Sequence, residues 1–236
     1  MTGPLAALRR RLDPAAKAEA GVSLVELIVV MFITSIVLAI VGSMFINVAN
    51  VTSNANGTNT RNAVAANVMN AMTKVISTAS NNAVSGQDDP DPAIVSGTAS
   101  ALTIITYVDT SPTNPTPTRV TYRVDSAGQV FEDRVAGVAS GSFYVFTGAT
   151  TTRQLGGPVT SAGLFTYLNK AGTVVTPSSN GSLSPSQRTQ IASIRITVVI
   201  ANTTTTGTAT GTNGNDPVQI INTVGMPNLI LTGTDS

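Results

Sequence analysis

One carboxylate, Glu26, stands inside an apolar run that extends over residues 22–46. A charge at the centre of a membrane-length helix costs about 2.5–3.5 kcal/mol, and less near the interface. Because Glu26 lies one turn into the run, it could reach the interface or take up a proton. Alternatively, it pairs with a positive charge once subunits pack together. The amine of Val22 would be such a charge, and it exists only if the chain is cut after Gly21.

The composition excludes several other kinds of chemistry. The sequence contains no cysteine, histidine or tryptophan, which rules out disulfides, thiolate or imidazole metal sites, a cysteine nucleophile and a histidine base. Residues 87–92 carry three aspartates and two prolines, but a calcium site needs several convergent oxygens, and we interpret this segment as a solvated loop. We therefore expect no metal and no cofactor.

No sequence motif indicates catalysis by the remaining residue types. The composition would allow a catalytic Ser–Lys pair or a pair of carboxylates, but the charged residues are scattered and no motif places a nucleophile near a base. We predict that the protein is not an enzyme.

The charge content is low and nearly balanced. Charged residues make up 11% of the chain and the formal net charge is +1, whereas soluble domains usually carry about 25% charged residues. Thr, Ser, Asn and Gly fill the difference, as suits an exported protein with a surface of hydroxyls and amides. No basic patch is large enough to predict nucleic-acid binding.

The elements around Glu26 form a membrane-spanning segment with a basic leader. As a helix rising about 1.5 Å per residue, residues 22–46 would reach roughly 37 Å, more than a hydrocarbon core of about 30 Å. The run is longer than the apolar core of a secretory signal, and no A-x-A-like exit follows it. Basic residues at positions 9–11 predict that the leader stays in the cytoplasm and that the bulk of the chain lies outside.

The sequence Gly-Val-Ser-Leu-Val-Glu before an apolar stretch resembles the N-terminal signature of type IV pilins and type II secretion pseudopilins. In that family a prepilin peptidase cuts after the glycine and methylates the new amine, and the glutamate at the fifth mature position is needed for subunit incorporation. The resemblance implies that Gly21 ends the leader, Val22 becomes the N-terminus and Glu26 is the assembly glutamate. Valine departs from the phenylalanine that usually occupies the first mature position.

Beyond the apolar run, residues 47–80 predict a weaker continuation of the helix. Apolar side chains recur there at steps of three and four residues, the amphipathic pattern, and Gly57 could mark a kink or local unwinding. Residues 81–100 are rich in turn formers and are predicted as a linker.

Residues 101–236 predict a β-rich globular head. Strands are expected at 102–108 and at 142–146, hairpins at 119–132 and at 165–175, a central strand at 191–200 and a last strand at 218–231. The loop at 177–186 is rich in serine and proline, and residues 203–215 are a Thr/Gly-rich loop. This strand order resembles the larger minor pilins, of the J-type pseudopilin or PilW kind.

We therefore predict an α+β protein with five parts. They are a cleaved basic leader (1–21), a transmembrane and assembly helix (22–46), its amphipathic continuation (47–80), a linker (81–100) and a head of antiparallel β-sheet (101–236), on which the helix packs.

The resemblance implies a structural, minor subunit of a type IV pilus or related filament. Its expected partners are the prepilin peptidase, other pilin or pseudopilin subunits, membrane lipid before assembly and the inner-membrane assembly platform. We expect a single-pass cytoplasmic-membrane protein with its head outside, which then enters an extracellular or periplasmic filament. The alternative is a membrane-tethered adhesin or binding module that is not built into a filament.

Overall fold

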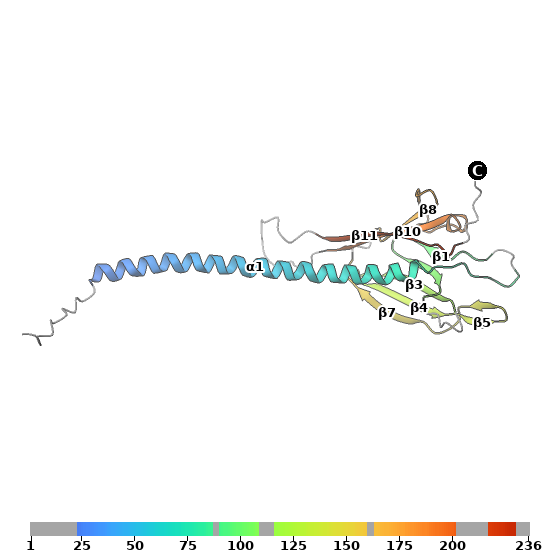
Figure 1. Ribbon diagram of the computed structural model, residues 1–236, viewed down its shortest axis with the longest axis horizontal. Coiled ribbons are helices and arrows are strands. Elements are labelled where there is room, and N and C mark those ends of the chain that lie inside the picture. The colour runs from blue at the N-terminus through green and yellow to red at the C-terminus, as the bar shows by residue number, and fades with distance from the viewer. Residues whose placement is uncertain (1–22, 87–89, 109–115, 160–162, 202–216, 230–236) are drawn as a thin grey trace, which may run out of the picture. The chain divides into compact units, whose positions relative to one another are not determined.

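The computed structural model describes residues 23–86, 90–108, 116–159, 163–201 and 217–229. Two units make up the chain, Met1–Ser53 and Asn54–Ser236. Helix α1 (Leu24–Ile76) begins in the first unit and ends in the second, and the described strands belong to the second (Figure 1). A long N-terminal helix followed by antiparallel sheets confirms the predicted α+β class.

Helix α1 is continuous over 53 residues. The predicted local unwinding at Gly57 is absent, because helical structure is assigned on both sides of that residue and through it. Glu26 lies in the first turn and Lys74 in the last, so each charge complements the partial charge of the helix end that it occupies.

The helix ends a few residues before the predicted limit of position 80. Hydroxyl groups explain the early end: Ser77 donates to the Lys74 carbonyl at 3.0 Å, and Thr78 donates to the Val75 carbonyl at 3.0 Å. The backbone hydrogen bonds that follow join residues three apart instead of four: Thr78 N donates to the Val75 oxygen, and Ala79 N donates to the Ile76 oxygen. Side chains that bond the last carbonyls in this way compete with continued helix.

The part of α1 in the first unit is apolar on all sides. Large hydrophobic side chains from Leu24 to Val51 are exposed, including Phe32 and Phe45. An 18-residue window reaches a mean hydropathy of 2.9 with none of it buried, and α1 is the single helix among the described residues that is long and apolar enough to cross a membrane. A helix that is apolar all round needs an apolar environment on every side.

The first sheet of the second unit has five antiparallel strands in the order β1-β2-β3-β4-β7. Its hairpin β3–β4 confirms the prediction at 119–132, and Asp125 makes the turn by accepting the amides of Ala127 and Gln129 at 2.9 and 2.7 Å. Gly128 closes the turn with a φ of 75°, where a glycine is least strained. The strands are β1 (Ile94–Gly97), β2 (Leu102–Thr106), β3 (Thr118–Val124), β4 (Val130–Ala136) and β7 (Thr151–Gly156).

A second sheet has four antiparallel strands in the order β11-β10-β8-β9. Strand β10 pairs with β11 on one side and β8 on the other, which confirms the prediction of a central strand at 191–200. Short strands β5 and β6 form a separate two-stranded ribbon. The remaining elements are β5 (Val138–Ser140), β6 (Phe143–Val145), β8 (Phe165–Asn169), β9 (Val174–Val175), α2 (Pro185–Arg188), β10 (Ile191–Ile200) and β11 (Val218–Gly225).

Several elements differ from the sequence prediction. Strand β1 lies inside the segment predicted as linker, where it pairs with β2. Strand β7 was not predicted, because four of its six residues are exposed and only Leu155 is buried, so it lacks an apolar alternation. Helix α2 begins in the segment predicted as a loop, and Ser184 starts it with a capping box in which Gln187 is the partner.

The second half of α1 supplies one side of the core. Its buried residues recur at three- and four-residue steps, so they share one face of the helix. Contacts reach both sheets: a Cβ at Gly156 of β7 would lie 2.8 Å from Val64 Cγ1, and Asn222 of β11 donates to Thr73 Oγ1 at 3.1 Å. The buried helix residues are Ala65, Val68, Met69, Met72, Val75 and Ile76.

Replacing Met72 tests this packing. Met72 is fully buried, so Met72→Ala should lower the free energy of unfolding of the head by about 2–5 kcal/mol. Met44 offers a matched control because it lies on the same helix but is 67% exposed, and Met44→Ala should leave the unfolding midpoint unchanged. Thermal melts of both full-length variants in detergent measure the effect, and equal midpoints would contradict the described packing.

Candidate functional site

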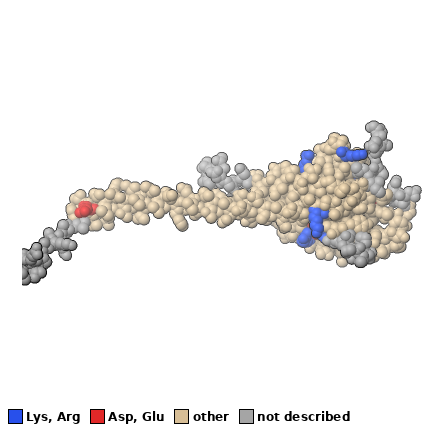
Figure 2. All heavy atoms as spheres, viewed as in Figure 1, with Lys and Arg blue, Asp and Glu red and all other residues tan. Residues whose placement is uncertain are grey.

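Glu26 is the only one of the predicted processing and assembly residues that the structure describes. It lies in the first turn of α1 and its side chain is exposed. Gly21 and Val22 lie outside the described residues. Figure 2 shows acidic colour at the start of the described helix and an uncharged surface directly after it.

Among the residues that the structure describes, the start of α1 presents a single carboxylate. Ser23 precedes the helix, and its carbonyl accepts the Leu27 amide at 3.0 Å. The residues that follow Glu26 on the helix are apolar as far as Ile33. A single carboxylate on such a surface can bind a cation or accept hydrogen bonds, but it offers no nucleophile–base pair.

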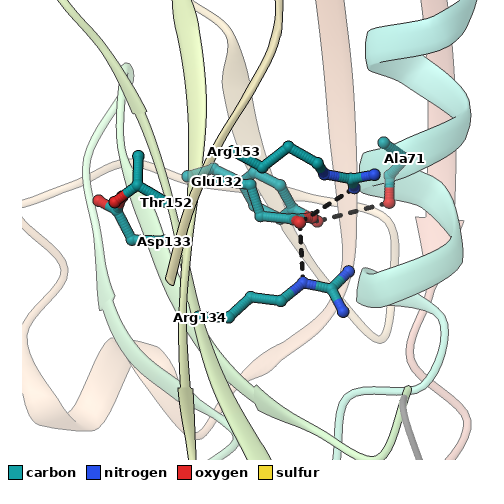
Figure 3. Close-up of polar contacts among 7 residues, drawn as sticks. Ala71, Glu132, Asp133, Arg134, Thr152 and Arg153 are labelled. Atoms are coloured by element: carbon teal, nitrogen blue, oxygen red, sulfur yellow. Dashed lines mark hydrogen bonds and ion pairs between the residues drawn. The ribbon is translucent and has the colours of Figure 1, made fainter. Parts of the chain in front are cut away.

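A second polar site lies in the head and was missed by sequence reasoning. Glu132 of β4 is fully buried, and its Oε1 accepts from Arg134 Nε at 2.8 Å and from Arg153 Nη2 at 3.0 Å. The Tyr122 hydroxyl donates to Glu132 Oε2 at 3.0 Å and lies 3.4 Å from the Ala71 carbonyl of α1 (Figure 3). The group therefore joins the first sheet to the helix.

Strand register brings these side chains together. Tyr122 of β3 is directly opposite Glu132 of β4, which is directly opposite Arg153 of β7. Residues paired across antiparallel strands point to the same face. The signal was present in the sequence: Glu132 is two residues after the buried Val130, so the alternation of the predicted hairpin places its carboxylate inward.

Electrostatics keep Tyr122 in its protonated, donating form. Burial is the main cause that raises the pKa of Tyr122 far above its ordinary value, and the nearby Glu132 carboxylate raises it further. A buried carboxylate without a cation would be strongly unfavourable. Arg134 and Arg153 supply that positive charge, with side chains 25% and 58% exposed.

A separate ion pair lies next to this group. Asp133 Oδ2 is 2.8 Å from Arg123 Nε, and Thr152 donates to Asp133 Oδ1 at 2.6 Å. The hydrogen bond from Arg123 is the main cause that lowers the pKa of Asp133 below its ordinary value. Because successive residues of a strand alternate, Asp133 points away from the face that Glu132 occupies.

An open cleft of ≈ 570 Å³ lies beside the Glu132 group. One wall is the exposed side of α1, with Asn67, Asn70 and Lys74, and the other is formed by residues of β4 and β7. None of the described residues that line the cleft is aromatic. Its lining residues are Asn67, Asn70, Ala71, Lys74, Val75, Glu132, Arg134, Thr151 and Arg153.

The residues described by the structure include no group of three carboxylates that could hold a metal ion. Asp91 belongs to the segment considered for calcium, and its backbone pairs with that of Asn82. Residues 87–89 of the same segment lie outside the described part of the chain. The expectation of no metal there stays a prediction.

Comparison with known proteins identifies one segment. Residues 16–42 match the family model described as the prokaryotic N-terminal methylation motif. The matched range contains Gly21, Val22 and Glu26 and supports a type IV pilin-like or pseudopilin precursor, a class of proteins that is structural and not catalytic. Together with the exposed apolar helix, it suggests a membrane-anchored protein. No curated protein matches the chain.

Removing one hydroxyl tests the buried carboxylate group. Tyr122→Phe leaves Glu132 Oε2 without its tyrosine donor, and an unsatisfied buried acceptor costs about 1–3 kcal/mol. Urea denaturation of the full-length chain should show a loss of that size. Tyr107→Phe is the control, because the partly exposed Tyr107 hydroxyl has no hydrogen bond to any residue that the structure describes; an equal loss in both variants would contradict the assigned role.

The Asp133 ion pair predicts a dependence of stability on pH. Since the folded pKa is below the ordinary 3.8, the pair stabilises the head above that value and the contribution disappears as the pH falls through the folded pKa. Asp133→Asn should therefore destabilise the head near neutral pH by less than about 1 kcal/mol, as is usual for exposed pairs. Denaturation across the acid range should show the two proteins converging, and a constant difference would contradict the prediction.

Proposed function

We propose that the protein is a structural, minor subunit of a type IV pilus or a related type II secretion-like filament. The observation that carries the proposal is the match of residues 16–42 to the methylation motif, in a chain whose helix α1 is apolar on every side in its first half and has one carboxylate in its first turn. A helix of this kind is stable in a bilayer and equally among other apolar helices.

Processing would create the N-terminus used in assembly. The prepilin peptidase cuts after Gly21, removes residues 1–21 and methylates the Val22 amine. The basic cluster in the leader keeps that end of the chain in the cytoplasm, and the head lies outside. Before assembly, lipid covers the apolar half of α1.

Assembly would then replace lipid contacts by contacts with other pilin or pseudopilin subunits. The inner-membrane assembly platform extracts the helix, and Glu26 pairs with the N-terminal amine of a neighbouring subunit. A carboxylate buried without a cation among apolar helices would be strongly unfavourable. Only the axial register that brings the amine to Glu26 avoids that cost, so the pair selects one register.

A minor role is favoured by the strand order of the head, which resembles the larger minor pilins. The final segment departs from their usual V-x-L-R-N-L pattern, because Pro227 occupies the position of the arginine. Strand β11 ends at Gly225, before this proline.

Expression with and without a prepilin peptidase tests the proposed processing. Intact-mass analysis should find a species that begins at Val22 only when the peptidase is present. A chain that keeps residues 1–21 under both conditions would contradict the proposal.

Substitution of Glu26 separates a filament subunit from a membrane-tethered adhesin. Glu26→Gln keeps the size and removes the charge, so the variant should remain in the membrane and be absent from sheared filaments. Ser35→Ala is a control on the same helix, since the Ser35 hydroxyl bonds only its own helix at the Met31 carbonyl; this variant should assemble. Normal incorporation of Glu26→Gln would exclude the charge pairing, and absence of the unaltered protein from filaments would favour the adhesin.

A further inference from the structure

The cleft beside Glu132 carries more positive than negative charge. Lys74, Arg134 and Arg153 line it, against the single carboxylate of Glu132. Glu132 is fully buried, whereas Lys74 is exposed and Arg153 is 58% exposed. The accessible charge of the cleft is therefore positive. Figure 2 shows basic colour on the drawn face of the head and no acidic colour there.

Glu132 also holds the arginines in place. It binds Arg134 through Nε and Arg153 through Nη2. Each guanidinium carries five N–H donors in a rigid plane, so each ion pair uses only part of this set. Arg153 is exposed at the cleft and has donors beyond the one that Glu132 uses. Donors already held in position lose less side-chain entropy when a ligand binds.

A second, independent feature adjoins the cleft. Strand β7 is an end strand of the five-stranded sheet and, among the described strands, pairs only with β4. Residues 151–154 of β7 are exposed. The Leu155 carbonyl accepts a hydrogen bond from Asn67 Nδ2 of α1 at 3.2 Å, so the edge to which an extended peptide can add is that of residues 151–154.

The two features select the same ligand. A residue of an added strand that lies opposite Arg153 would point to the same sheet face as Arg153 and Glu132, which is the face of the cleft. An acidic side chain at that position would meet Arg153, with Lys74 on the opposite wall. The described lining residues include no aromatic ring on which a sugar could stack.

We propose that the head binds an extended acidic peptide segment of a partner protein. The segment adds to the free edge of β7 and places a glutamate or aspartate side chain in the cleft of Lys74, Arg134 and Arg153. The inference concerns residues 54–236 and does not depend on filament assembly.

Binding of a labelled peptide to the full-length chain in detergent tests the proposal. The probe is a fluorescent nine-residue peptide of alternating threonine and glutamate, followed by fluorescence anisotropy. Binding should weaken with added salt. A peptide with glutamine for glutamate should not bind, and one with proline at alternate threonines should not bind because it cannot add as a strand.

Two variants locate the site. Arg153→Gln and Lys74→Gln should each weaken binding by about tenfold or more, as expected for the loss of one charge-assisted hydrogen bond. Lys74→Gln leaves the Glu132 ion pairs intact, so it tests the cleft without disturbing the fold. Arg195→Gln is the matched control, because Arg195 is an exposed cation on β10 of the other sheet, and its affinity should be unchanged.

Three results would overturn the inference. They are no binding of the glutamate peptide, equal binding by the Arg153→Gln and Lys74→Gln variants, and equal binding of the proline peptide. An oligogalacturonate carries carboxylates without a peptide backbone, and tighter binding of this sugar acid than of the peptide would also overturn it. None of these results bears on cleavage after Gly21, which the mass measurement tests separately.

Discussion

A carboxylate that is removed from water needs a cation, and this requirement applies at both ends of α1. In the head, Glu132 is fully buried and the fold itself provides Arg134 and Arg153 within 3.0 Å. At the start of the helix, Glu26 stands on an apolar surface, and the described residues around it provide no cation. Glu132 therefore receives its cations from the chain's own fold, whereas we propose that Glu26 receives its cation from another subunit.

The difference follows from the composition of α1. Its first half is apolar on all sides, so it cannot bury itself against one sheet and depends on lipid or on other helices. Its second half carries small polar residues on one face and Val68, Met72 and Ile76 on the other, and that apolar face packs in the head. The first half of α1 is therefore stable only in lipid or among other helices, whereas the second half belongs to the core of the head.

Sequence reasoning predicted the elements whose patterns are local. Neighbouring residues are enough to predict three of these elements. They are the apolar run, the β3–β4 hairpin with its turn at Asp125, and the alternating strand β10. Strands β1 and β7 were missed because they have little apolar alternation: β1 is only four residues long, and most of β7 is exposed.

The polar sites divide in the same way. Glu26 was found because a charge in an apolar run is conspicuous, whereas Glu132 stands among Asp133 and Arg134 and looks like part of a solvated strand. The alternation from Val130 points its side chain inward, and the register with Tyr122 and Arg153 shows which groups it meets there. The cleft could not be predicted at all, because its two walls come from α1 and from strands about sixty or more residues further along the chain.

The pairing of Glu26 with a neighbouring amine is the central claim, and zero-length crosslinking tests it most directly. A carbodiimide joins a carboxylate to an amine only when the two are in contact. In sheared filaments, mass spectrometry should find Glu26 joined to the N-terminal residue of an adjacent subunit, and the same treatment of unassembled protein in detergent should not. Filaments in which Glu26 remains unmodified while other carboxylate–amine pairs are joined would contradict the account.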